Sequence, residues 1–188
     1  MKKLALLSVF AFFASTSAYA GVYIEPYVGY GMGSSKGDFN IVGVGTATVD
    51  QTNKGLVFGG KLGMSSLGLA GGLDYSQFKS KDHDKTGSNP DSDSTVTNIG
   101  VFVQYKFPIL FKVSASYLFS AESKTDDTTS TGSGFKIGAG YTGLPFVAIN
   151  VDYISTKSTK IKSDLYTIDN VDVKSDLTML SVSLPFDF

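Results

Sequence analysis

The chain ends on Ser181-Val182-Ser183-Leu184-Pro185-Phe186-Asp187-Phe188, and this stretch decides the fold. Every second residue is apolar, which is the period of a β-strand: Val182, Leu184, Phe186 and Phe188. The last residues of a domain usually fray unless something ties them down. Because the pattern here continues to the C-terminal residue, it predicts a sheet that closes on itself, with the last strand paired to the first.

The N-terminus indicates a secreted chain. Lys2 and Lys3 precede an apolar run over residues 4–13, and Ala18-Tyr19-Ala20 follows it. This is the pattern of a signal peptide, and the run is much shorter than the roughly 20 apolar residues of a membrane-spanning helix. We expect cleavage after Ala20, a signal peptide over residues 1–20, and one domain over residues 21–188 with no further domain after it.

Composition sets limits on the chemistry. The 188 residues include no Cys, while 16 basic and 17 acidic residues leave a net charge of −1. The absence of Cys excludes disulfides, thiol nucleophiles and Cys-bound metals. The balanced charge gives no sign of a nucleic-acid partner.

Alternation with period two continues through the rest of the chain and predicts eight strands with one apolar face each. They cover residues 22–33, 55–64, 67–76, 98–107, 109–122, 134–142, 147–153 and 180–188. Tight connections are expected near residues 65–66, 107–108 and 143–145, and long polar ones over residues 34–53, 80–93, 123–131 and 155–172. Short turns at one end and long loops at the other are typical of outer-membrane barrels.

A secreted β-sandwich is the competing interpretation, because its strands alternate too. The polar faces of a sandwich meet water, and long charged residues would be expected on them. Here those faces are rich in Gly, Ser and Ala, and aromatic residues gather near the ends of the apolar faces, as in the aromatic girdles of membrane barrels. We therefore predict an all-β fold, a membrane-spanning eight-stranded antiparallel up-and-down β-barrel.

The whole mature chain resembles the small eight-stranded outer-membrane β-barrel proteins, such as the OmpA transmembrane domain and OmpX. The resemblance rests on the signal sequence, the eight strands, the unequal connections and the terminal Phe188. It implies a place in a Gram-negative outer membrane, among lipid and lipopolysaccharide. It also implies that Phe188 is an assembly signal read by the barrel assembly machinery. We expect a monomer without a cofactor.

Charged residues on the inward faces are expected to fill the lumen, since eight strands leave room for side chains or one small ligand. They are Glu25, Lys61, Asp74, Lys106, Lys112, Lys136 and Asp152. We expect Lys136 to pair with Asp152, and Glu25 with Lys61. Lys106 and Lys112 flank one turn, where they would repel each other unless an acid lies between them.

These charges favour a plugged lumen, and two other interpretations stay open. The charges could instead line a narrow gated pore. Apolar molecules could also pass along the lumen, past Phe102, Leu118 and Phe146.

One long connection carries candidate site residues. Asp82, Asp84, Thr86 and Asp93 fall at positions 1, 3, 5 and 12 of a calcium-loop template, which prefers Asp or Asn at position 5 and Glu at position 12. The mismatch favours a solvated loop without metal. His83, the only histidine, is the only candidate for His-based catalysis.

The sequence thus predicts a non-enzymatic outer-membrane barrel with a charge-plugged lumen and long polar loops available to a surface ligand. A small-solute channel is the alternative, and a barrel-type outer-membrane enzyme is the third possibility. The first long connection is further predicted to extend the barrel as a hairpin, because residues 41–49 are rich in Val, Thr and Ala.

Overall fold

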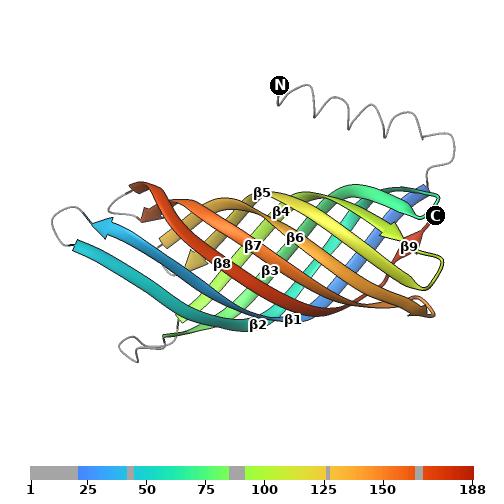
Figure 1. Ribbon diagram of the computed structural model, residues 1–188, viewed down its shortest axis with the longest axis horizontal. Helices are drawn as coiled ribbons and strands as arrows, with labels where there is room; N and C mark the ends of the chain where they lie inside the picture. The colour runs from blue at the N-terminus through green and yellow to red at the C-terminus, as the bar shows by residue number, and fades with distance from the viewer. Residues whose placement is uncertain (1–20, 42–44, 85–91, 126–127, 164–166) are drawn as a thin grey trace, which may run out of the picture.

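The computed structural model describes the backbone of residues 21–41, 45–84, 92–125, 128–163 and 167–188, and the side chains of residues 21–36, 51–80, 94–125, 128–162 and 173–188. The chain forms a barrel of antiparallel strands (Figure 1). The strands are β1 (Gly21–Ile41), β2 (Gly45–Ser66), β3 (Leu69–Asp84), β4 (Ser92–Lys106), β5 (Phe111–Thr125), β6 (Thr128–Leu144), β7 (Val147–Ser163), β8 (Thr167–Ser183) and β9 (Phe186–Asp187). No helix among the described residues is long and apolar enough to cross a membrane.

The barrel closes where the sequence predicts it. β1 pairs with β2 on one side and with β8 and β9 on the other, so the start of β1 lies beside the C-terminal strand. β9 continues β8 past Pro185, which has no backbone N–H to donate. The last residue is fixed by two hydrogen bonds between Val22 and Phe188, of 2.9 and 3.0 Å. The C-terminal strand therefore leaves no open edge against β1.

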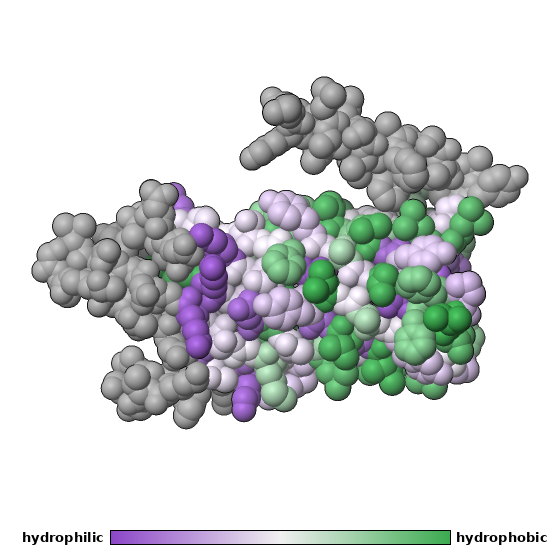
Figure 2. Space-filling view, in the orientation of Figure 1, coloured by the Kyte–Doolittle hydropathy of each residue, from purple (hydrophilic) through white to green (hydrophobic). Residues whose placement is uncertain are grey.

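Alternation places apolar side chains on the outside. Each strand exposes residues such as Val28, Leu62 and Val151, which are 57, 56 and 53% exposed. Figure 2 shows these hydrophobic side chains gathered over the part of the barrel near the C-terminus, with a more hydrophilic surface toward the other end. An outward apolar band of this kind is the surface that a membrane covers.

The predicted long loops are mostly strand. β1 and β2 pair from Gly21↔Ser65 to Ile41↔Gly45, so the first connection extends the barrel as a hairpin, as predicted. The other long connections were predicted too long for the same reason, because backbone pairing of polar residues continues well past the apolar band. At the end opposite the short turns, the barrel thus projects a crown of paired strands beyond the apolar band.

Two local departures shift the predicted pattern. Leu67 lies in the first tight turn rather than in β3, with a φ of 51°, and Gly68 follows with a φ of 82°. Two successive positive φ values match the hairpin turn that suits the twist of the strands. In β5, the register shifts between Leu118 and Ala121, which turns Ala121 inward and moves Ser120 off the lumen face. Alternation alone does not reveal such a bulge.

Candidate functional site

The lower lumen, near the short turns, is built around the Glu25 carboxylate. Glu25 is 1% exposed and forms ion pairs with Lys112 and, at 3.8 Å, with Lys61. It also accepts hydrogen bonds of 2.5 Å from the hydroxyls of Tyr23 and Ser183. Four partners from β1, β2, β5 and β8 thus converge on one carboxylate, which is the condition for keeping a buried charge ionised.

A second ion pair crosses the lumen directly above. Lys136 on β6 pairs with Asp74 on β3, and the two side chains are 2 and 1% exposed. Asp74 also accepts hydrogen bonds from Tyr27 at 3.0 Å and from Ser116 at 2.8 Å. The Lys136 ammonium lies 5.0 Å from the centre of the Tyr27 ring, a distance at which the ring face attracts a cation.

The expected partners are partly different in the structure. Glu25 and Lys61 lie opposite each other, as their register requires. The predicted ion pair of Lys136 with Asp152 was wrong, because Lys136 lies opposite Ile154 and extends across the barrel to Asp74. Asp152 lies opposite Gly138 and is 5% exposed.

Two predicted lumen residues lie at the mouth instead. Lys106 is exposed at the end of β4, so its assignment to the lumen was wrong: the strand ends there, and the side chain meets solvent. Its register partner Lys112 points inward to Glu25, which is the intervening acid that the sequence required. Phe146 is 79% exposed in the turn between β6 and β7, with a φ of 61°, and does not line the lumen.

Glycines on β6 make room for this network. A Cβ at Gly138 would contact the carboxylate of Asp152, and a Cβ at Gly140 would contact the side chains of Asn150 and Lys112. The small inward residues of the sequence therefore accept the long charged side chains of neighbouring strands.

Apolar layers lie on both sides of the charges. Toward the short turns, Tyr23 and Phe102 pack 6.0 Å apart with Ala70. Toward the crown lies the upper lumen cluster: Tyr27, Val57, Phe78, Leu118, Ile154, Leu177 and Met179. Most of this cluster was not predicted, although the sequence carries a signal for it. Stretches such as Leu56-Val57-Phe58 and Tyr117-Leu118-Phe119 are apolar on both faces of the strand.

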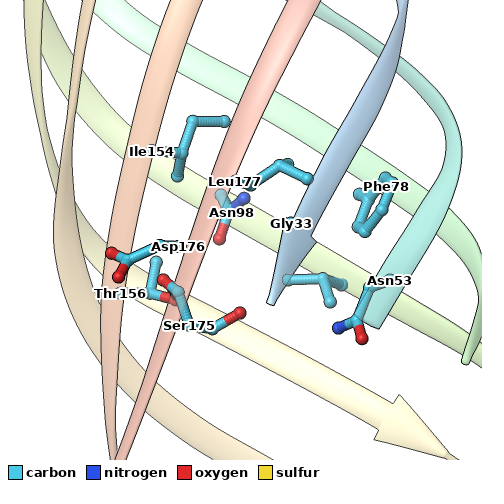
Figure 3. Close-up of a pocket in the computed structure, with 10 residues that line it drawn as sticks. Gly33, Asn53, Phe78, Asn98, Ile154, Thr156, Ser175, Asp176 and Leu177 are labelled. Atoms are coloured by element: carbon cyan, nitrogen blue, oxygen red, sulfur yellow. Dashed lines mark hydrogen bonds between the residues drawn. The ribbon is translucent and has the colours of Figure 1, made fainter. Parts of the chain in front are cut away.

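Above the upper lumen cluster, a small cavity opens toward the crown (Figure 3). Asn53 and Asn98 line it, and their side-chain carbonyl oxygens are buried without a hydrogen-bond partner in the structure. The remaining lining is mixed: Gly33, Phe78, Val96, Ile154, Thr156, Ser175, Asp176 and Leu177. Buried amide oxygens of this kind are usual positions for ordered water.

The candidate calcium residues are only partly described. Asp82 and Asp84 belong to β3 and Asp93 to β4, where Asp82 lies opposite Ser92 and Asp93 opposite Lys81. The first and last positions of the predicted calcium loop thus lie in paired strands, whereas a calcium loop of this type is one continuous loop. Thr86 and the side chains of all these residues, like that of His83, lie outside the described part of the chain. The described residues hold no cluster of metal-ligating side chains.

The barrel and a comparison of the sequence with family models together assign the chain to a protein family. A family model described as "Outer membrane protein beta-barrel domain" matches residues 4–186. The chain belongs to this family. It is therefore an outer-membrane β-barrel protein of the Gram-negative type. Among curated proteins, none matches the chain.

Solved structures of similar fold agree with this assignment. Neisserial surface protein A is 19% identical, with a TM-score of 0.54 over 89% of this chain and 99% of its own. The attachment invasion locus protein Ail of Yersinia pestis, in complex with the heparin analogue sucrose octasulfate, is 14% identical, with a TM-score of 0.56 over 88% and 99%. AlkL, determined in lipid bilayers, is 15% identical, with a TM-score of 0.55 over 90% and 92%. At these identities the likeness establishes the fold.

Proposed function

We propose that this protein is a closed, non-enzymatic barrel that presents its extracellular crown to surface partners. The observation that supports a closed lumen is the stacking of its layers. Ion pairs around Glu25 and Asp74 join opposite walls, and the upper lumen cluster covers them. The buried acids are held by lysines and hydroxyls far from the crown, where a substrate would arrive.

Planar-bilayer recording of refolded residues 21–188 tests closure. The wild type is expected to stay silent, with folding checked by heat-dependent gel mobility. Discrete openings would overturn closure and favour the channel. Lys136→Gln and the matched Lys106→Gln would then place the pore, since only the first side chain lies in the lumen.

The contact element that we propose is the β1–β2 hairpin. The described pairing of β1 with β8 ends at Asp38↔Asp172, and that of β2 with β3 at Gln51↔Asp84. Beyond these positions β1 and β2 pair with each other up to Ile41↔Gly45 and reach past the other strands (Figure 1). Strand edges of this kind can accept an added strand from a partner.

A cultured epithelial monolayer is a suitable probe, because one protein of similar fold is named for attachment and invasion. Bacteria that express the full chain are expected to attach in greater number than bacteria with an empty vector. Replacing residues 38–48 by Asn-Gly should remove that gain. The matched variant Asp126→Asn/Asp127→Gly changes the connection between β5 and β6 and should keep the gain in attachment. Equal attachment by the truncated chain would overturn the proposal that the β1–β2 hairpin is the contact element. No gain in attachment by the full chain would overturn the proposed role in surface contact.

Two other partners are part of the proposal. Outer-membrane lipid and lipopolysaccharide surround the apolar band, and the barrel assembly machinery reads the C-terminal strand with Phe188. The apolar outer face and the strand that continues to the last residue support both. We propose a monomer, because the barrel closes its own sheet without a second chain.

A further inference from the structure

The cavity above the upper lumen cluster has an apolar side and a polar side. Ile154 and Leu177 lie opposite each other in the β7–β8 pair, and Phe78 joins them in the wall. The next inward pair toward the crown is Thr156 with Ser175. Figure 3 shows the three apolar side chains on one side of the cavity and Thr156 and Ser175 on the other. A molecule held here would meet hydrocarbon on one face and polar groups on the other.

Two amide oxygens in the wall of the cavity have no partner. Asn53 and Asn98 are only 8 and 3% exposed. Their amide nitrogens donate hydrogen bonds to the hydroxyls of Ser35, at 3.1 Å, and Ser76, at 3.3 Å. Their Oδ1 atoms are buried and accept no hydrogen bond in the structure. Because a buried acceptor without a donor costs free energy, the cavity favours a molecule that brings at least two donors.

The charge of the wall excludes ions as ligands. Of the described residues that line the cavity, Asp176 alone carries a charge. Its carboxylate accepts a 2.8 Å hydrogen bond from the hydroxyl of Tyr153, which is 38% exposed on the outer face. An ammonium or carboxylate group inside the cavity would therefore lie without a counter-ion, and burial of an unpaired charge is costly. The ligand that fits this wall is uncharged.

The size of the cavity limits the ligand further. With its open mouth included, the empty space measures about 370 Å³, and the enclosed part is smaller. Such a space accepts a molecule of a few carbon atoms. Two separate acceptors require two donors, and the apolar side requires carbon atoms between them.

We propose that this cavity binds a small uncharged polyol, a molecule with a hydrocarbon face and several hydroxyl groups. Its hydroxyls donate to Oδ1 of Asn53 and of Asn98, in place of water, and its carbon chain packs against Phe78 and Leu177. A ligand without donors would leave both acceptors unpaired, which gives the site its selectivity. The site lies above the closed part of the lumen and is independent of the hairpin contact.

Titration of erythritol into isotope-labelled residues 21–188, folded in micelles, tests the site. Nuclear magnetic resonance of the asparagine side-chain amides gives the readout. Erythritol, butane-1,4-diamine and succinate share a chain of four carbon atoms and carry hydroxyl, ammonium and carboxylate groups, respectively. Erythritol should shift the side-chain amide signals of Asn53 and Asn98, and the two charged compounds should leave them in place.

Single leucine variants test the two acceptors. Asn53→Leu and Asn98→Leu each remove one amide and keep a side chain of similar size. Each should weaken erythritol binding about fivefold, measured on the signal of the remaining asparagine. Asn150→Leu is the matched control, because Asn150 Oδ1 is also buried without a partner but lies outside the cavity, where its amide donates to Ser181 and Ser183. This control should bind as the wild type does, and heat-dependent gel mobility checks that each variant folds.

Several results would overturn the proposal. Erythritol that shifts neither signal in the wild type would show that the cavity holds water only. Leucine variants that bind as tightly as the wild type, or an equal loss of affinity in Asn150→Leu, would show that the two amide oxygens do not hold the ligand. A larger shift with the diamine or with succinate would indicate a site for a charged ligand. If one leucine variant does not fold, the other variant and the three compounds still decide the question.

Discussion

The lower and upper halves of the lumen solve the same packing problem in opposite ways. The lower half holds Lys61, Lys112 and Lys136 in a network of ion pairs and hydrogen bonds with Glu25 and Asp74, and Glu25 and Lys136 are only 1 and 2% exposed. The upper half holds the upper lumen cluster, with Val57, Leu118 and Met179 each 1% exposed. Tyr27 belongs to both, because its ring packs upward while its hydroxyl donates to Asp74.

This difference indicates which half of the lumen fixes the placement of the strands relative to one another. An apolar layer tolerates exchange of its side chains for others of similar volume, whereas an ion-pair network requires each partner at one position. We infer that the lower half fixes the mutual placement of the strands, and that the upper half seals the lumen toward the crown. Loss of one charge should therefore cost more than loss of one apolar side chain.

Lys136→Met should give the largest effect. It leaves the Asp74 carboxylate buried without its lysine, which costs about 3–5 kcal/mol when a buried pair is broken. The chain has no Trp, so urea unfolding in lipid vesicles is best followed by circular dichroism and gel mobility. Lys106→Met, at an exposed position, should change the free energy of unfolding by less than about 0.5 kcal/mol.

The double variant Lys136→Met/Asp74→Leu sharpens this test. It removes both charges, so most of the lost stability should return. If Lys136→Met unfolds at the wild-type urea concentration, the lower network does not specify the barrel.

Leu118→Ala tests the upper half and should cost about 2–4 kcal/mol through the cavity that it leaves. Leu67→Ala makes the same chemical change at a turn position that is 97% exposed, and should be nearly neutral. Equal effects of the two variants in the same urea titration would mean that the upper lumen cluster is not packed as described.

These two halves also differ in how well sequence predicts them. Alternation identified the inward charges, because a charged side chain cannot face lipid without cost. It missed most of the upper lumen cluster, since inward apolar residues such as Val57 interrupt the alternation that marks the strands. The strand extensions were missed for a related reason. Above the membrane both faces of a strand meet water, so no alternation marks it.

The ion pair between opposite walls of the lumen, Lys136 with Asp74, could not be predicted from the sequence either. Neighbouring strands suggested Lys136 with Asp152, but a lysine side chain is long enough to reach the opposite wall of a narrow barrel at Asp74. Which of several acids it reaches depends on strand tilt and stagger, and these follow from the closed sheet as a whole.

Gly138→Ala tests how tightly the lower half is packed. The added methyl group would contact the Asp152 carboxylate, and overpacking of this kind costs about 1–3 kcal/mol. Gly60→Ala is the matched control, since a Cβ there has no neighbour closer than 3.8 Å. A neutral Gly138→Ala in the same unfolding assay would show that Asp152 moves freely in the lumen.

Phe188→Ala should have the smallest effect on stability and still reduce assembly. The Phe188 side chain is 76% exposed, and its backbone hydrogen bonds to Val22 do not need the ring, so refolded protein should lose less than about 1 kcal/mol. In cells, the fraction that becomes heat-modifiable should fall several-fold if the assembly machinery reads the terminal ring. Phe146→Ala removes a phenylalanine ring that is 79% exposed in a turn at the same end of the barrel, and should assemble normally. Equal assembly of the two variants would assign Phe188 to membrane contact alone, because the only difference between them is the place of the ring in the last strand.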